Sequence, residues 1–176
     1  MGHPYQYLIP LLSLFWVRVD LTDLWRLNIS VHIIDIRDGD TLTASSGHRT
    51  FKVRLSKIDA PELDQPFHGS RKNAGIASRD CLRRMTPEKA VLSVEGFDVY
   101  HRILGDVEGL NLRAVEEGCT GLYPHAHFSS VREKSIYLRA LSSARKKRRG
   151  VWAFKGYLLP KKWRRLSKPN AHQRSH

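Results

Sequence analysis

Three short segments of this chain contain residue types that could act together on a phosphate ester. They are Asp38–Thr41 (Asp-Gly-Asp-Thr), Arg54–Glu62 (Arg-Leu-Ser-Lys-Ile-Asp-Ala-Pro-Glu) and Tyr100–Arg102 (Tyr-His-Arg). Carboxylate oxygens suit hard cations such as Ca²⁺ and Mg²⁺, which take oxygen ligands. Arginine is a forked, permanently charged donor that matches the geometry of a phosphate group. The segments therefore bring cation ligands and phosphate-binding groups into one chain.

Phosphodiester hydrolysis needs such groups together. A cation and fixed positive donors stabilise charge at the phosphorus, and a carboxylate orients or deprotonates water. Each segment also has an ordinary explanation, because Asp-Gly is usually a turn, Asp-Ala-Pro-Glu is an ordinary strand exit and an arginine near a tyrosine usually lies on the surface. Only the three in combination point to chemistry.

The elements that must position these residues are short β-strands. Phe51, Val53 and Leu55 alternate with polar residues, and this period of two is typical of a half-buried strand. Asp38-Gly39 predicts a hairpin in which Gly39 takes a positive φ. Strands are expected over Val31–Ile36, Thr41–Ala44, Phe51–Leu55, Val91–Val94 and Val99–Leu104.

Three helices are expected, over Ala74–Met85, Leu110–Glu117 and from Ser130 to a stop at Gly150. Gly118 is the expected C-terminal stop of the second helix. Ser130 and Glu133 form a capping box, in which each side chain satisfies a backbone amide of the first turn. About five strands and three helices indicate a small α+β barrel.

The positive charge is concentrated at one end of the chain. Of 176 residues, 30 are Lys or Arg and 17 are Asp or Glu, and twelve of the basic residues lie between Arg145 and His176, where no acidic residue occurs. Residues 1–144 are nearly neutral. A cationic tail favours a polyanionic partner, either nucleic acid or an anionic membrane surface.

Other features leave the compartment open. Leu8–Val17 has the length of a signal-peptide core, but no Lys or Arg precedes it and no small-x-small cleavage site follows, so secreted, periplasmic and cytoplasmic locations all remain. No run of 18 apolar residues occurs, which excludes an ordinary membrane-spanning helix. Cys81 and Cys119 are expected to pack in the core, either reduced or joined in one bridge.

From about Ser30 to Arg165 the chain resembles the staphylococcal nuclease (thermonuclease) family. The resemblance rests on the order of Asp-Gly-Asp-Thr, an arginine strand leading into Asp-x-Pro-Glu, and Tyr-x-Arg, and on the closing segment Arg149-Gly150-Val151-Trp152. It implies a five-stranded OB-fold β-barrel with helices packed on it, over residues 30–153, between an N-terminal extension (1–29) and a basic tail (154–176). It also implies calcium-dependent endonuclease cleavage of DNA and RNA with little sequence specificity, leaving 3′-phosphates.

The resemblance assigns roles to individual residues of this sequence. Asp40 and Asp59 would bind Ca²⁺ through their carboxylates and Ala60 through its backbone carbonyl. Glu62 would hold the attacking water, while Arg54 and Arg102 would grip the phosphate. The expected substrate contacts are Tyr100, Tyr123, Lys161, Lys162, Arg164 and Arg165.

Two positions depart from the family pattern. The family often has Thr where Ala60 stands, which a carbonyl ligand does not require. It usually has Gly where His101 stands. If this position needs a positive φ, His101 carries a strain of about 1–3 kcal/mol, or else the turn differs and Arg102 points elsewhere.

Two functions remain open from sequence alone. Barrels of this family also occur as catalytically silent nucleic-acid-binding modules, which typically lose the acidic ligands or the arginines. This chain keeps Asp40, Arg54, Asp59, Glu62 and Arg102, which favours the enzyme. DNA and RNA are the expected partners of a monomeric chain, with no protein partner and no membrane association.

Overall fold

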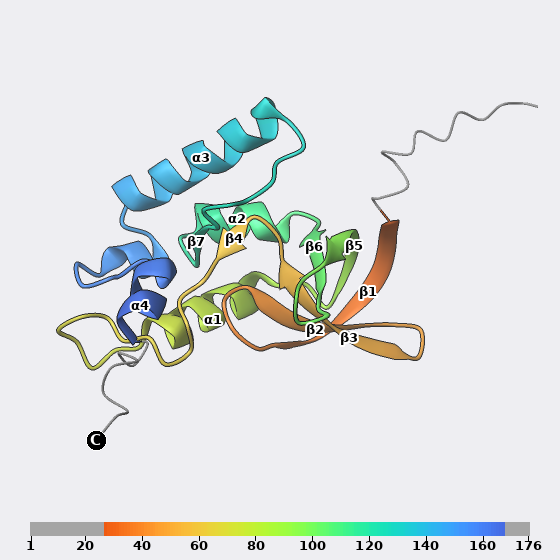
Figure 1. Cartoon of the computed structure of the whole chain (residues 1–176), viewed down its shortest axis with the longest axis horizontal. Helices are drawn as coiled ribbons and strands as arrows, with labels where there is room; N and C mark the ends of the chain where they lie inside the picture. Colours follow the sequence, from red (N-terminus) through yellow and green to blue (C-terminus); the bar gives the residue numbers. More distant parts are fainter. Residues whose placement is uncertain (1–26, 168–176) are drawn as a thin grey trace, which may run out of the picture.

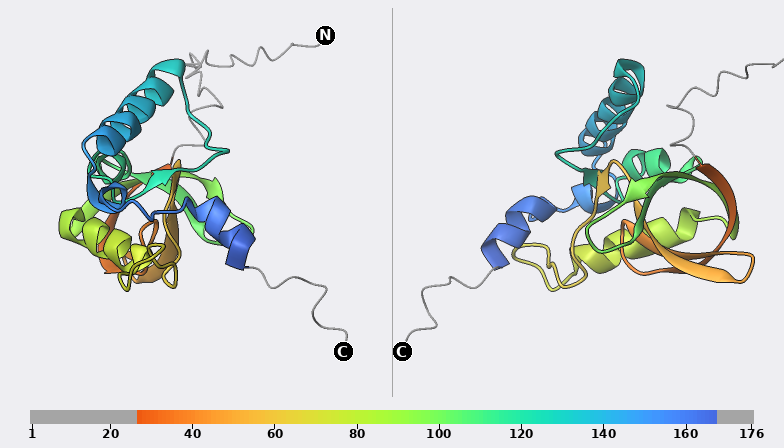
Figure 2. Two further views of the ribbon diagram at one scale, coloured as in Figure 1. Left: turned by 90° about the vertical axis from the view of Figure 1, so that its left-hand side faces the viewer. Right: turned by 45° about the vertical axis from the view of Figure 1, so that its right-hand side comes forward.

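A five-stranded closed barrel forms the centre of the molecule. The computed structural model describes residues 27–167 (Figure 1). The barrel strands are β1 (Leu27–Ile36), β2 (Thr41–Ser46), β3 (Arg49–Leu55), β5 (Lys89–Phe97) and β6 (Ile103–Val107). They neighbour one another in the order β1-β2-β3-β6-β5, and only the β3–β6 pair is parallel. The right-hand view of Figure 2 shows the strands curving into a ring. The predicted five-stranded α+β barrel is confirmed.

The barrel core follows the alternation seen in the sequence. Leu42 and Ala44 on β2, and Val53 and Leu55 on β3, are fully buried, while the residues between them lie nearer the surface or face the site. Burying a Leu or Val side chain contributes about 1.5–3 kcal/mol to folding. This apolar interior holds β2 and β3 in register, and both strands carry site residues at their ends.

Gly39 has a different role from the one predicted. It is absent from the residues with a positive φ, so the prediction that the turn depends on a left-handed glycine was wrong. A Cβ atom at position 39 would instead collide with Ser78 Oγ and lie 2.6 Å from Ala60 Cβ. Glycine is needed because the turn packs directly against helix α1 and the Asp59–Ala60 segment.

The strand predicted over Val99–Leu104 is displaced. Residues 98–102 form a tight turn, closed by hydrogen bonds from His101 N to Asp98 O and from Asp98 N to Arg102 O, both 3.0 Å. Strand β6 begins only at Ile103. A two-stranded ladder that was not predicted, β4 (Ile58–Asp59) with β7 (Gly121–Leu122), lies outside the barrel. Its strands are two residues long, too short to show a period.

The three predicted helices are present, and the structure adds further helical segments. The helices are α1 (Ala74–Met85), α2 (Leu110–Glu116), α3 (Val131–Lys146), the 3₁₀ segment η2 (Gly150–Ala153) and α4 (Pro160–Ser167). Helix α3 packs on α2 (Figure 1), and α1 packs on η2. Helix α4 falls within the segment predicted as a basic tail, and α3 ends four residues before Gly150. Most of the predicted N-terminal extension lies outside the described residues.

The predicted capping box at α3 forms in a modified way. Ser130 Oγ accepts a hydrogen bond from Glu133 N at 3.0 Å, as expected. The Glu133 carboxylate accepts from Ser129 N at 2.7 Å instead of from Ser130 N. Gly118 follows α2 with φ 69°, which confirms it as the left-handed stop of that helix.

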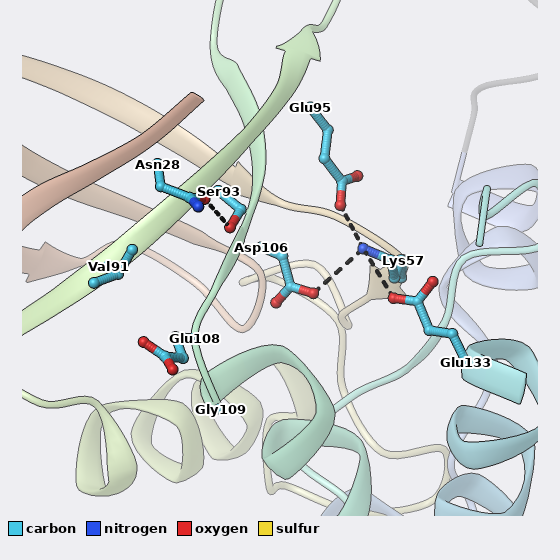
Figure 3. A pocket seen from close by; sticks show the side chains of 9 residues that line it. All are labelled: Asn28, Lys57, Val91, Ser93, Glu95, Asp106, Glu108, Gly109 and Glu133. Carbon is cyan, nitrogen blue, oxygen red and sulfur yellow. Dashed lines mark hydrogen bonds and ion pairs between the residues drawn. The ribbon is translucent and has the colours of Figure 1, made fainter. Parts of the chain in front are cut away.

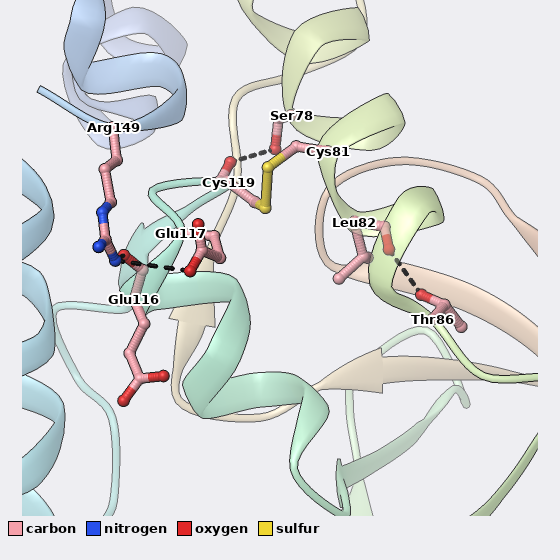
Figure 4. Close-up of a disulfide and its surroundings, with 8 residues drawn as sticks. All are labelled: Ser78, Cys81, Leu82, Thr86, Glu116, Glu117, Cys119 and Arg149. Atoms are coloured by element: carbon pink, nitrogen blue, oxygen red, sulfur yellow. Dashed lines mark hydrogen bonds and ion pairs between the residues drawn. A yellow bond between two sulfur atoms is a disulfide. The ribbon is translucent and has the colours of Figure 1, made fainter.

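Cys81 and Cys119 are both buried, as predicted, and they are joined in a disulfide (Figure 4). The bridge links α1 to the segment that leads from α2 into β7, across 38 residues of sequence. Beside it, Ser78 Oγ donates a hydrogen bond of 2.6 Å to Cys119 O. Within residues 27–167, no helix is both long enough and apolar enough to cross a membrane.

Candidate active site

The guanidinium of Arg54 joins two buried carboxylates. Its Nη1 lies 3.2 Å from Asp40 Oδ2, and its Nη2 lies 3.6 Å from Asp59 Oδ1. Arg54 is near the end of β3, Asp40 directly precedes β2, and Asp59 lies on β4. Arg54 Nη1 also donates to the carbonyls of Leu55 and Ile58, at 3.0 and 3.1 Å. These contacts fix the arginine in one orientation and place both carboxylates within reach of one guanidinium.

Asp40 is held in place through both its backbone amide and its carboxylate. Its amide donates to Asp38 Oδ1 at 3.0 Å, and its own Oδ2 accepts from Ala60 N at 2.6 Å. Burial raises the pKa of the Asp40 carboxyl, which Arg54 lowers in part and the Asp38 charge raises further. A cation placed beside this carboxyl would favour its ionised form.

Glu62 is close to this pair and more open to solvent, with its side chain 44% exposed. Arg164 on α4 clasps both acids: its Nη1 lies 2.8 Å from Glu62 Oε1, and its Nη2 lies 3.1 and 3.0 Å from the two Asp59 oxygens. Although burial lowers the pKa of Arg164, its hydrogen bonds to Asp59 and Glu62 raise that pKa above its usual range. In the structure Arg164 is a counterion of Asp59 and Glu62, and its predicted contact with the substrate stays a prediction.

Arg102 reaches the same region from the turn before β6. Its Nε donates to Asp98 Oδ2 at 2.7 Å, and its Nη1 donates to Thr41 Oγ1 at 3.2 Å, beside Asp40. His101 has φ 59°, so this position does adopt the left-handed conformation for which glycine is suited. Arg102 nevertheless points toward the Asp40 turn. Asp98 was not predicted, although Asp commonly begins a turn by accepting a hydrogen bond from the amide two residues on, as it does here from Tyr100 N, and this signal could have found it.

The two predicted tyrosines border a hollow beside Arg54 and Arg102. This hollow has a volume of about 280 Å³ and is lined by both arginines and both tyrosines, among others. Tyr100 is 77% exposed and lies under the Arg102 guanidinium, with 5.6 Å between its ring centroid and Arg102 Cζ. Tyr123 is 42% exposed. The predicted phosphate-binding and aromatic residues therefore lie on one surface.

The remaining predicted cations lie on α4, next to Asp59. Lys161, Lys162 and Arg165 are exposed residues of α4, and they line a second hollow that also touches Asp59. The structure therefore brings every predicted site residue into one region, from Tyr100 at one end to α4 at the other.

A buried lysine that sequence reasoning did not identify anchors the segment carrying Asp59. Lys57 Nζ contacts Glu95 on β5, Asp106 on β6 at 3.3 Å and Glu133 on α3 at 3.6 Å (Figure 3). Burial lowers the pKa of Lys57, but the hydrogen bond to Glu95 and the neighbouring carboxylates raise it overall. Lys57 itself has φ 68°. Its three ion pairs fix the turn between β3 and β4, and no local pattern marks it in the sequence.

The donor set fits a hard cation. Asp40 and Asp59 offer carboxylate oxygens, bridged by one guanidinium at 3.2 and 3.6 Å. Within residues 27–167, no group of three or more His, Cys, Asp or Glu side chains is arranged to hold a metal ion. A cation here would thus rest on two carboxylates, with other oxygens completing its shell. The structure shows the Ala60 amide bonded to Asp40; its carbonyl as a ligand remains a prediction.

Comparison with known proteins agrees with this geometry. Residues 52–154 match the family described as "Staphylococcal nuclease homologue". The chain belongs to this family. An uncharacterized endonuclease of Haemophilus influenzae is 34% identical over 169 residues, covering 92% of this chain and 88% of that protein. The micrococcal nuclease of Shigella flexneri is 31% identical over 150 residues, covering 77% and 80%. The chain is also 32% identical to the Escherichia coli protein ParB over 149 residues, covering 77% and 78%.

The family match begins at Lys52, so it includes Arg54, Asp59, Glu62 and Arg102 and leaves Asp40 outside. The alignment with the Haemophilus endonuclease covers 92% of this chain and must therefore extend over the Asp40 turn. As a member of the staphylococcal nuclease family, the protein is a nuclease, a hydrolase that acts on nucleic acid.

Proposed function

We propose that the protein is a calcium-dependent endonuclease that hydrolyses phosphodiester bonds of DNA and RNA with little sequence specificity and leaves 3′-phosphates. The observation that carries the proposal is the convergence of Asp40, Arg54, Asp59 and Glu62. One guanidinium bridges the two buried acids, and a more exposed carboxylate lies beside them. Burying charged groups costs desolvation free energy, so a buried ion cluster that is open to solvent at one carboxylate is a poor way to stabilise a fold.

Each residue then has a distinct task. Asp40, Asp59 and the Ala60 carbonyl would hold Ca²⁺, which when bound supplies positive charge next to the phosphate. Glu62 orients a water molecule and accepts its proton as the water oxygen bonds to phosphorus. Arg54 and Arg102 neutralise the charge that builds on the phosphate oxygens. The bond from phosphorus to the 5′ oxygen breaks, and this oxygen takes a proton from solvent.

Low sequence specificity follows from the kind of contacts available. Tyr100 and Tyr123 offer exposed aromatic rings, and stacking on an aromatic ring is tolerant of base identity because every base has a π-face. Lys161, Lys162 and Arg165 offer charge, which recognises the backbone and carries no sequence information. Arg164 would also contact the backbone of the substrate once Asp59 binds the cation and Glu62 binds the water.

The experiment is a cleavage assay on supercoiled plasmid and on a single-stranded RNA. We expect cleavage in Ca²⁺, none in excess chelator, and recovery when Ca²⁺ is restored, with 3′-phosphates found by end-group analysis. Glu62→Gln should lower kcat at least ~100-fold, the scale for losing one preorganised contact. The matched control is Asp64→Asn, an exposed carboxylate two residues further along, which should leave the rate unchanged.

Full activity in chelator would contradict the calcium assignment. The competing function, a silent binding module, predicts that the wild-type protein retains nucleic acid but never cuts it. A Glu62→Gln protein with the wild-type rate would show that the water is activated elsewhere.

A further inference from the structure

A second hollow lies next to the candidate active site, between β7, α3 and α4. Its volume is about 390 Å³, within the range of small-molecule pockets. Its apolar wall consists of Leu122, Pro124, Leu141, Leu159 and Pro160. Its charged residues are Arg145, Lys161, Lys162, Arg165 and one acid, Asp59. The hollow is therefore lined by five apolar residues and four cations, and it touches the candidate active site at Asp59.

The two hollows meet at the Arg54–Asp59 ion pair. Arg54 lines the hollow that holds Tyr100 and Tyr123, and Asp59 lines the apolar one. The two share no lining residue, and 3.6 Å separates Arg54 Nη2 from Asp59 Oδ1. A phosphate bound at this pair would have one hollow on each side.

We propose that the apolar hollow is a nucleotide subsite, which receives the nucleotide on the side of the scissile phosphate away from Tyr100 and Tyr123. This inference rests on the proposed function. The leucine and proline surface accepts the face of a base or its sugar, and the cations that line the hollow meet the next phosphate of the strand.

The charges favour a nucleic-acid strand as the occupant. Four cations face one acid, and that acid is already paired with both Arg54 and Arg164. The Arg145 guanidinium lies over the Trp152 ring, 4.5 Å from its centroid, so this cation is held in place. A ligand that is apolar in its middle and anionic at its ends, as a nucleotide within a strand is, complements this surface.

A subsite on each side of the phosphate has a consequence for substrate choice. A strand that continues in both directions fills both hollows, whereas a terminal phosphate fills only one. The arrangement therefore favours internal bonds over the bond next to a strand end.

The test couples one residue of the hollow to one base of the ligand. Short single-stranded DNA oligonucleotides, each with a single abasic site at a successive position, are titrated with Glu62→Gln protein, which should cut at least ~100-fold more slowly, and Kd is read by fluorescence anisotropy within that slower time. Leu159→Ser removes half-exposed apolar surface from the hollow without changing charge. Leu166→Ser is the matched control, because Leu166 lies on α4, is similarly exposed and does not line the hollow.

In the Glu62→Gln protein we expect an abasic site opposite the hollow to weaken binding about five- to tenfold, in addition to any penalty at the bases that stack on Tyr100 and Tyr123. Leu159→Ser should abolish the penalty at that position alone, and Leu166→Ser should retain it. If every abasic penalty is the same with Leu159→Ser as without it, no base occupies the hollow and the inference is overturned. That outcome leaves the proposed function intact as long as the wild-type protein cuts plasmid; absence of both cutting and oligonucleotide binding would overturn both.

Discussion

Asp98 holds Arg102 through its backbone and through its side chain. Asp98 Oδ1 accepts from the amides of Tyr100 and Arg102, at 2.9 and 3.0 Å, while Oδ2 accepts from Arg102 Nε. These bonds also keep His101 in its left-handed conformation, where glycine is usual in the family. A single carboxylate therefore offsets the strain of the turn and aims a phosphate-binding arginine.

Replacing Asp98 by Asn should make stability less sensitive to acid. Burial raises the pKa of Asp98, but the hydrogen bonds from Arg102 and Tyr100 lower it overall, below the ordinary value of 3.8. A carboxylate with a lowered folded pKa stabilises the fold fully above the unfolded pKa, and this contribution is lost as the pH falls through the folded pKa. We expect Asp98→Asn to cost about 1 kcal/mol of unfolding free energy at pH 7, and the cost to shrink below pH ~4. Urea unfolding of the wild-type and Asp98→Asn proteins between pH 3 and pH 8 measures this cost. A cost that does not change with pH would contradict the prediction.

Helix α4 is fastened to the site mainly by polar contacts. It has eight residues, of which only Pro160 is buried, and an isolated helix of this length is not stable in water. Arg164 binds Asp59 and Glu62, and just before the helix Gln65 Nε2 donates to Leu158 O at 2.7 Å. The position of α4 therefore depends on the same carboxylates that are proposed for catalysis.

Removing the Arg164 charge should tighten calcium binding in the absence of nucleic acid. Arg164 and a cation compete for Asp59, so Arg164→Gln should lower the Kd for Ca²⁺ several-fold from a starting value of order 10⁻⁴ M or weaker. Arg165→Gln is the matched control, since it loses the same charge on the same helix and makes no contact with the two acids. Calorimetric titration measures both proteins. Equal affinities would mean that Arg164 does not compete with the cation.

Over the whole molecule, charge is divided between a nearly neutral barrel and a cationic end. Within that end, α4 presents Lys161, Lys162 and Arg165 as exposed residues beside Asp59. This placement brings charge close to the reacting phosphate without placing those cations on it. Their contribution should therefore be to substrate affinity.

Neutralising these three cations together should reduce the salt dependence of duplex binding. Each phosphate contact contributes about −0.9 to the slope of log K against log salt, so Lys161→Gln, Lys162→Gln and Arg165→Gln combined should flatten it by about two to three units. At low salt and saturating substrate, kcat should change little, because cations that do not touch the reacting phosphate bind substrate and transition state equally. Binding is measured in the Glu62→Gln protein. Gln at Arg132, Lys134 and Arg139, exposed residues of α3, gives a control of equal charge, and an unchanged slope in the α4 triple variant would show that these cations do not touch the strand.

The sequence by itself predicted the barrel strands with alternating residues, the helices α1, α2 and α3, and the candidate site residues that the fold brings together: Asp40, Arg54, Asp59, Glu62 and Arg102. Side-chain periodicity is local, and the motif residues are few and ordered, so both can be read along the chain. The strand predicted over Val99–Leu104 begins only at Ile103, because Asp98 closes residues 98–102 into a turn. The β4–β7 ladder was missed because strands of two residues are too short to show a period, and α4 was missed because its run of basic residues was interpreted as a charged tail.

The tertiary structure alone decided how distant parts of the chain meet. Position 39 must be glycine because Ser78 and Ala60 lie too close for a side chain. Lys57 forms ion pairs with carboxylates from β5, β6 and α3. Cys81 forms a disulfide with Cys119. Arg164 lies 105 residues from Asp59 in sequence and binds it directly. Such contacts depend on closure of the barrel and packing of the helices on it, and one residue's type does not encode which partner the fold will bring to it. The residues that meet at the candidate site were therefore predictable from their order along the chain, while its internal counterions and its second hollow exist only in the folded chain.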